Sequence, residues 1–329
     1  ALGPMSLSPA DLAEVKPRPD DSSSQTPVRS AYRPESLSRV ARIEGGGEEG
    51  WSLWFKLLVA TGLISVIAGL AWGGIAYTRW LRDTEIAETM SAAEQEVQRD
   101  RLPDYKSALT RLGTLIAKEP EGVEPRALAL AIYARLLIEF DPKDVDWQAH
   151  MESLSASLTA GQQGDPRLTA ALGWRALSQS KPAEVRYLLD AALDRRQDKP
   201  ELWALEADLA AYDRHFEQAV KLFDRALRED PAQQGWAYRR AQAAFALKDY
   251  AKVKDSLEPV LRGSSDHYRA RFLLFETDLA HGRAASEIRP EFEALWNIIE
   301  KNLPPLERAR GLLLKARLLA ESDAKQAAE

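Results

Sequence analysis

The sequence has no cysteine among its 329 residues and only four histidines. Without cysteine there is no disulfide bond, no thiolate nucleophile, no iron–sulfur cluster and no cysteine-ligated zinc. The histidines are too few and too scattered to indicate a metal site: His150, His215, His267 and His281. A chain without thiols also suits a compartment in which free thiols are oxidised.

Basic runs and catalytic motifs are missing as well. The chain has 44 basic and 50 acidic side chains, with no block of Lys and Arg that could follow a nucleic-acid backbone. It has no phosphate-binding glycine loop, no metal-spaced histidine pair and no nucleophile elbow. We expect the plentiful carboxylates to be solvated or to cap helices, as at Asp141, Asp144, Asp146, Glu206 and Asp208. These absences predict a protein that is not an enzyme and binds neither a cofactor nor nucleic acid.

Large apolar side chains are scarce in residues 1–50, which are rich in Ser, Pro and Gly. Such a segment buries too little apolar surface to offset the entropy of ordering it. We predict a disordered tail here. It is either a solvated leader or a docking segment that gains charge on phosphorylation at Thr26 and Ser22–Ser24.

One long hydrophobic run follows the tail, with 22 uncharged residues from Leu57 to Thr78. At roughly 1.5 Å per residue it spans about 33 Å, close to the hydrocarbon thickness of a bilayer. Aromatic residues flank it on both sides, as expected at two membrane interfaces: Trp51, Trp54 and Phe55 before it, Tyr77 and Trp80 after it. Residues 51–80 therefore predict a single transmembrane helix in contact with the lipid bilayer.

Small residues recur on one face of this predicted helix, at Gly62, Ser65, Gly69 and Gly73. Such a face lets a second helix approach closely, which would make the chain a homo-oligomer or join it to a membrane partner. The other interpretation is that small residues are simply frequent in membrane helices.

The charges beside the run favour one orientation. Three basic residues precede it (Arg39, Arg42 and Lys56) and two follow it (Arg79 and Arg82). By the positive-inside rule we expect the N-terminus in the cytoplasm and the larger C-terminal part outside it, in the periplasm if the membrane is a bacterial inner membrane.

Residues 81–102 contain neither Gly nor Pro and predict a helical extension of the membrane helix. Four apolar residues form a stripe along it: Ile86, Met90, Ala93 and Val97. The stripe packs either onto the next helix of the same chain or into a short coiled coil.

Residues 166–267 contain three 34-residue windows that align without gaps and begin at Pro166, Pro200 and Gln234. Small residues share one column at Gly173, Ala207 and Ala241. Three apolar columns follow: Val185, Ala219 and Val253; Leu189, Phe223 and Leu257; Ala192, Ala226 and Val260.

These columns resemble the tetratricopeptide repeat (TPR). The second window matches at Trp203, Ala207, Phe216, Ala219, Phe223, Ala226 and the closing Asp230-Pro231. It departs from the family pattern at Glu206 and Ala210, where a leucine and a tyrosine are usual. The resemblance implies an all-α fold, a TPR-like α-solenoid of antiparallel helix pairs behind a single N-terminal transmembrane helix.

The regions on either side fit the repeat less well. Residues 103–165 contain a second-helix pattern at Tyr105–Pro120, nine residues out of phase, and two further helices at Arg126–Phe140 and Asp146–Leu158. We expect Gly161–Pro166 to be a loop. Residues 268–329 predict a degenerate pair, Tyr268–His281 and Pro290–Lys301, and a capping helix at Pro305–Glu321 whose outer face should be polar.

The resemblance also implies a binding surface, because in this family the first helix of each pair lines a concave face that holds peptides. Partner-binding residues are then expected at Trp174, Asp208, Tyr212, Tyr238, Gln242 and Phe245. Trp174 and Phe245 have an alternative role in packing between pairs.

Together these features predict a single-pass inner-membrane protein whose extracytoplasmic solenoid is a protein-interaction scaffold. It would serve a bacterial envelope complex such as a motor, pilus or secretion machine, with a cytoplasmic partner for the tail. Two alternatives stay open, a translocon-associated chaperone that holds exported chains and a non-catalytic recruiter of cell-wall or cytochrome-assembly enzymes.

Overall fold

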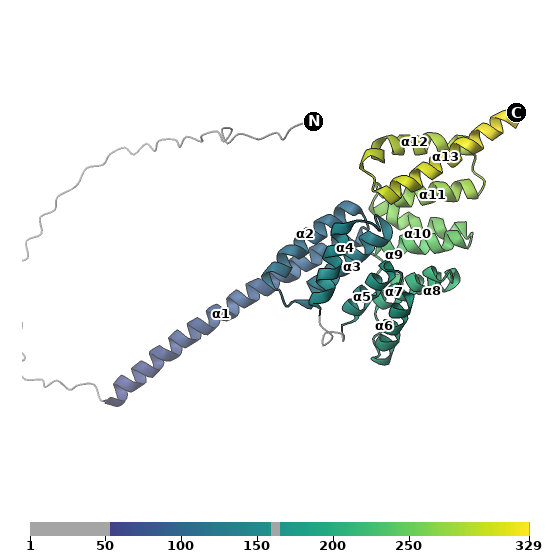
Figure 1. Cartoon of the computed structure of the whole chain (residues 1–329). Coiled ribbons are helices and arrows are strands. Elements are labelled where there is room, and N and C mark those ends of the chain that lie inside the picture. Colours follow the sequence, from purple (N-terminus) through teal and green to yellow (C-terminus); the bar gives the residue numbers. More distant parts are fainter. Residues whose placement is uncertain (1–52, 159–164, 329) are drawn as a thin grey trace, which may run out of the picture. The chain divides into compact units, whose positions relative to one another are not determined.

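The computed structural model describes residues 53–158 and 165–328, and every regular element in these ranges is a helix (Figure 1). The predicted all-α fold is confirmed for this part of the chain. The helices are α1 (Leu53–Gln98), α2 (Leu102–Lys118), α3 (Val123–Glu139), α4 (Val145–Ser157), α5 (Pro166–Ser178), α6 (Pro182–Asp194), α7 (Pro200–Tyr212), α8 (Phe216–Glu229), α9 (Gln234–Ala246), α10 (Tyr250–Gly263), α11 (Tyr268–Ala280), α12 (Ala285–Ile299), the 3-10 turn η2 (Glu300–Asn302) and α13 (Pro305–Ala328).

Two predicted segments lie outside the described residues. These are the N-terminal tail, residues 1–50 with the adjoining Trp51, and most of the loop predicted at Gly161–Pro166.

The helices keep the 34-residue period of the sequence. The first helices α5, α7, α9 and α11 begin at residues 166, 200, 234 and 268, and the second helices α6, α8 and α10 at 182, 216 and 250. The spacing therefore continues one helix beyond the three predicted repeats. Figure 1 shows the later pairs stacked from α8 to α12.

The turn inside each pair repeats as well. Ser180, Arg214, Lys248 and Gly282 are spaced by 34 residues, and all four have a positive φ, between 57° and 98°. A left-handed residue is a common way to end a helix and reverse the chain. Only the fourth turn uses glycine, the residue that adopts this conformation most easily.

The apolar columns predicted from the sequence form the interior of the pairs. Ala207, Ala219, Phe223 and Ala226 are fully buried. The small-residue column allows first helices to touch, because a Cβ built on Gly173 would lie 2.2 Å from Leu205 Cδ2. These are TPR-like helix pairs, and we call α2 to α13 the array.

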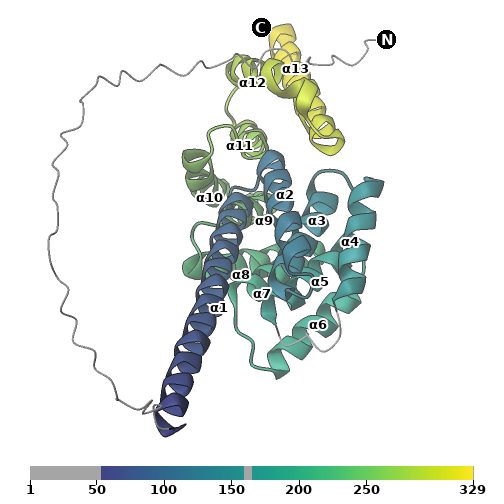
Figure 2. The same ribbon diagram turned by 90° about the vertical axis from the view of Figure 1, so that its left-hand side faces the viewer.

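The last turns of α1 belong to the first layer of the array. Met90 and Ala93 are buried, with Ile86 and Val97 beside them, in a cluster that includes Leu112 of α2 and Phe140 of α3. Figure 2 shows α2 alongside α1 and α3. The stripe therefore packs onto the next helices of its own chain.

The C-terminal helices differ from the sequence expectation in two respects. Helix α12 begins at Ala285 and not at Pro290, because the buried side chains Ile288, Phe292 and Trp296 form a stripe that starts before the proline. A capping helix requires a polar outer face, and α13 does not have one. Its side chains Leu306, Leu312 and Leu313 are 46%, 46% and 72% exposed.

In the described part of the chain, α1 is the one helix with the length and apolar composition to cross a membrane. Its aromatic residues Trp54, Tyr77 and Trp80 are exposed. Gly62, Ser65, Gly69 and Gly73 are also exposed, and nothing lies within 4 Å of a Cβ built on the three glycines. Their role in helix packing stays a prediction.

Candidate functional site

A groove with a volume of about 710 Å³ runs along the first helices α3, α7, α9, α11 and α13. Five of the six predicted binding residues line it: Asp208, Tyr212, Tyr238, Gln242 and Phe245. The sixth, Trp174, lines a neighbouring cavity of about 160 Å³. The structure thus brings most of the predicted set to one surface.

The rim of this groove is apolar. Tyr212 and Phe245 face it from α7 and α9, and Ile138, Leu306 and Leu313 face it from α3 and α13. Tyr212 is 50% exposed and Leu313 is 72% exposed. Tyr238 and Trp174 are buried, so as folded they offer little surface to a partner. The partner-binding role of all six residues stays a prediction.

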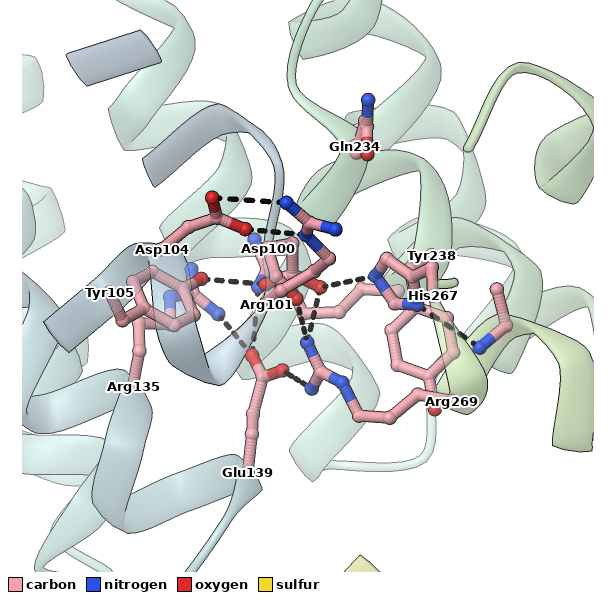
Figure 3. Close-up of polar contacts among 12 residues, drawn as sticks. Asp100, Arg101, Asp104, Tyr105, Arg135, Glu139, Gln234, Tyr238, His267 and Arg269 are labelled. Atoms are coloured by element: carbon pink, nitrogen blue, oxygen red, sulfur yellow. Dashed lines mark hydrogen bonds and ion pairs between the residues drawn. The ribbon is translucent and has the colours of Figure 1, made fainter. Parts of the chain in front are cut away.

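The floor of the groove is a network of buried ion pairs, and Figure 3 shows the part of it around Asp100, Glu139 and Arg269. Arg269 of α11 lies at its centre and is almost fully buried. Its guanidinium donates to the carboxylates of Asp100 and Glu139 and, at 2.7 Å, to the backbone carbonyl of Asp100. Its Nε is 3.5 Å from a carboxylate oxygen of Glu307. One side chain therefore joins the α1–α2 corner, α3 and α13 to α11.

Asp100 occupies the corner between α1 and α2 and is fully buried. Its φ of 55° is left-handed, which turns the chain between the two helices. The Tyr105 hydroxyl donates to its carboxylate at 2.6 Å, and His267 Nε2 lies 3.5 Å away. A Cβ on Gly235 would lie 2.9 Å from Asp100 Oδ1, so glycine at 235 lets the carboxylate approach α9.

A second part of the network surrounds Asp208 of α7. Arg135 donates to its carboxylate at 2.8 Å, the Trp174 indole N–H at 2.9 Å, and Arg239 Nε lies at 3.1 Å. Arg239 also donates to Glu139 at 2.9 Å, which connects this part to Arg269. Asp208 is therefore a structural acid within the array and not the solvated charge expected from the sequence.

Arg310 extends the network on α13. It donates to both carboxylate oxygens of Glu276, at 2.8 and 3.3 Å, and to the Tyr238 hydroxyl at 2.7 Å. Four arginines thus face five carboxylates along the floor: Arg135, Arg239, Arg269 and Arg310 against Asp100, Glu139, Asp208, Glu276 and Glu307. Because these charges satisfy one another, the groove presents little unpaired charge to a ligand.

The pKa values of two acids in the network, Asp100 and Glu307, are shifted in opposite directions. Burial alone would raise the pKa of Asp100, but the Arg269 guanidinium and His267 hold it well below its usual range. Burial raises the pKa of Glu307 to about 7, although Arg269 and Arg310 oppose the rise. Oε2 of Glu307 is buried and accepts no hydrogen bond within the described structure.

Sequence reasoning missed Asp100, Glu139, Arg269 and Glu307. One signal was available, since Arg135 and Glu139 lie in a segment, Ala127–Phe140, that is otherwise nearly all apolar. A helix that is apolar on all sides is buried, and charges within it must then be paired. The partners of Arg269 lie 130 and 169 residues away in sequence, and no local pattern indicates such pairs.

The lining of the groove offers shape and apolar contact, with no arrangement of a metal site in the described residues. No group of three or more His, Asp or Glu side chains in the described residues could hold a metal ion. Asp144 and Asp165 cap α4 and α5 by accepting from backbone N–H groups.

The groove, with apolar side chains above an internally neutralised floor, suits a segment of polypeptide.

No protein-family model matches the chain, and no curated protein is similar to it. Two solved structures of the human IFIT1 dimer, with m7Gppp-AAAA and with PPP-AAAA, match at 12% identity and a TM-score of 0.46. They cover 66% and 68% of this chain and 54% and 57% of the IFIT1 chain, so this chain spans little more than half of it.

The C-terminal part of a TPR repeat-containing protein from Cytophaga hutchinsonii matches at 16% identity and a TM-score of 0.34, over 65% of this chain and 79% of that one. Because these TM-scores are below 0.5, we draw no conclusion about fold or function from the similarities. The TPR-like fold rests on the chain's own helix pairs and their 34-residue spacing.

We expect Asp100→Ala to destabilise the array by about 3–5 kcal/mol, because it leaves the buried Arg269 guanidinium without its main partner. Asp266→Ala is the matched control, since Asp266 also pairs with an arginine, Arg101, but is 71% exposed, and an exposed pair contributes less than about 1 kcal/mol. Thermal unfolding followed by circular dichroism measures both. Equal effects of the two variants would contradict the central place of Asp100.

Glu307 should make the array less stable as the pH rises. Its pKa is higher in the folded chain than the usual 4.5, so its contribution is complete below about pH 4.5 and is lost as the pH passes 7. We expect the free energy of unfolding to fall by up to about 3 kcal/mol between pH 5 and pH 8. Glu307→Gln should remove this fall. A variant with an unchanged pH profile would show that Glu307 does not titrate in this range.

Proposed function

We propose that this chain is a single-pass membrane protein whose helical array binds another protein in the groove of α3, α7, α9, α11 and α13. The observation that carries the proposal is the apolar rim above a neutralised floor. Exposed aromatic and leucine side chains around a concave surface are typical of sites that bury a partner's apolar residues.

The energetics of the rim fit this role. Burying an exposed Leu or Tyr side chain stabilises a complex by roughly 1.5–3 kcal/mol at most. Tyr212, Leu306 and Leu313 together therefore account for a moderate affinity once the loss of translational freedom is subtracted. The ion pairs below hold the first helices in place, so little ordering is needed when the partner binds.

We infer that α1 anchors the array to a bacterial inner membrane, with the N-terminus in the cytoplasm and the array in the periplasm. The length of the apolar run, its flanking aromatic residues and the small excess of basic residues before it support this placement. The anchor would raise the concentration of the array near other envelope proteins, as in a motor, pilus or secretion complex.

Two other roles are compatible with a groove of this type. A chaperone that holds exported chains would need a broad apolar surface to accept many sequences. Here the floor is charged and its carboxylates are mostly paired with arginines, which favours a defined partner over many. A recruiter of cell-wall or cytochrome-assembly enzymes would use the same groove for one defined partner.

The groove can be tested with a photo-crosslinking amino acid in place of Tyr212 in the membrane-embedded chain. We expect it to capture one protein in amounts close to those of the chain itself, because Tyr212 lines the groove and is half exposed. Tyr187 of α6 is the matched control, since it is 73% exposed and does not line the groove.

Capture at Tyr187 as strong as at Tyr212 would contradict groove binding. A smear of many captured exported chains at Tyr212 would favour the chaperone.

The membrane placement can be tested separately, because the chain has no cysteine of its own. Ser265→Cys lies in an exposed turn between α10 and α11. A membrane-impermeant maleimide should label it in intact spheroplasts and should not label Ser24→Cys in the tail. The reverse pattern would invert the topology. Labelling of both cysteines would show that no membrane separates them and would contradict the transmembrane helix.

A further inference from the structure

Within the described residues, α13 occupies the position of a first helix and no second helix follows it. Each earlier first helix from α5 to α11 is followed by its pair, α6, α8, α10 or α12. Helix α13 follows α12, packs against α12 and α11, and is the last helix that the structure describes. On one side it buries Gly311, Leu314 and Leu318, with Gly311 directly against the ring of Trp296.

Helix α13 carries apolar surface that the described residues leave exposed. Among the paired first helices α5, α7, α9 and α11, Tyr212 is the single large apolar side chain that the structure shows as exposed. Helix α13 by itself exposes three large apolar side chains, Leu306, Leu312 and Leu313. A helix with apolar residues on two opposite sides normally buries both.

Four exposed residues of α13 share one side of the helix, and we call them the end face: Ala309, Leu312, Leu313 and Ala316. Their spacing is i, i+3, i+4 and i+7, which places them within about 100° of one another at 3.6 residues per turn. This is the pattern of an apolar stripe that packs against another helix.

Basic residues border the end face. Arg308 and Lys315 lie one above the other along one edge, seven residues apart. Arg308 donates to the backbone carbonyls of Glu300 and Lys301, and Lys315 Nζ is 5.9 Å from the Trp296 ring centre. No carboxylate whose position the structure describes pairs with either side chain. At this edge α13 presents positive charge that a ligand can neutralise.

We propose that the end face binds an amphipathic helix of a partner protein, one whose apolar stripe is bordered by Asp or Glu, and that this helix packs on α13 as a second helix packs on a first. The apolar stripes would pack as the helices do within each pair. Carboxylates of the partner would lie beside Arg308 and Lys315. Charge complementarity of this kind sets the choice of partner and its orientation.

The charges disfavour a second copy of this chain as the occupant. An antiparallel contact of α13 with α13, centred between Leu312 and Leu313, places Arg308 of one copy beside Lys315 of the second copy. Like charges in such a contact repel each other, so self-association is selected against. The end face meets the groove at Ala309 and Leu313, which line both surfaces, whereas Leu312, Arg308 and Lys315 do not line the groove and therefore distinguish the two.

The test uses a peptide built on the chain's own second helix α8, residues 216–229, in which Lys221, Arg225 and Arg228 are replaced by Glu. Binding to the full chain in non-ionic detergent is measured by fluorescence anisotropy at low salt. We expect the acidic peptide to bind about tenfold more tightly than the unchanged peptide. Lys315→Glu should remove this preference, and Leu312→Glu should abolish binding of both peptides.

Tyr187→Glu is the matched control, because it places the same charge on an exposed apolar position of α6. It should leave binding unchanged, and circular dichroism confirms that each variant is folded. The proposal is overturned if the acidic peptide has no advantage, or if Leu312→Glu binds as well as the wild type.

Two results would assign the end face to another occupant. A dimer of the full chain that Leu312→Glu converts to a monomer would show that a second copy covers it. Loss of peptide binding on adding phosphatidylglycerol vesicles, but not phosphatidylcholine vesicles, would show that it lies on an anionic lipid surface. Either result overturns the proposal, and the crosslinker at Tyr212, on α7, tests binding in the groove separately.

Discussion

The structure depends on one buried cation, the guanidinium of Arg269. A charge in that position is tolerated only when carboxylates surround it. Those carboxylates come from the α1–α2 corner, from α3 and from α13. These helices must therefore meet around Arg269 for the guanidinium and its three carboxylates to be paired. The apolar columns make each helix pair stable. The ion pairs determine how pairs distant in sequence are placed against one another.

The pairs themselves could be predicted because their information is local. The 34-residue spacing, the small residues at Gly173, Ala207 and Ala241 and the apolar columns are all visible within single windows. Most of the network could not be predicted, because every member except Arg135 and Glu139 looks like an ordinary surface charge. Asp100 has no neighbour in sequence that indicates Arg269, and only superhelical stacking brings the two together. The candidate binding residues fall between these cases, since the repeat placed five of them at the groove but did not indicate that Tyr238 is buried.

The two surfaces proposed for binding meet at Ala309 and Leu313 but differ in their charge. In the groove, the charged side chains pair with one another within the chain. The side chains available to contact a partner are apolar, such as Tyr212 and Leu313. At the end face, Arg308 and Lys315 have no carboxylate partner among the described residues, and charge contributes to recognition. An array of similar helices can thus offer one surface selected by shape and another selected by charge.

The ion pairs have a mechanical consequence, because apart from the α1–α2 corner they connect first helices and bypass second ones. Along a solenoid, curvature is the sum of small rotations between neighbouring pairs. Opening the groove would separate α3 from α11 and break the buried ion pair of Glu139 with Arg269, which leaves Glu139 with Arg135 and Arg239 and leaves Arg269 with Asp100. Bending that spreads only the second helices leaves these contacts intact. The inner wall of the array is therefore stiff against widening, while the second helices α8 and α10 are joined by more exposed ion pairs, Lys252 with Asp224 and Arg240 of α9 with Asp224 and Asp255.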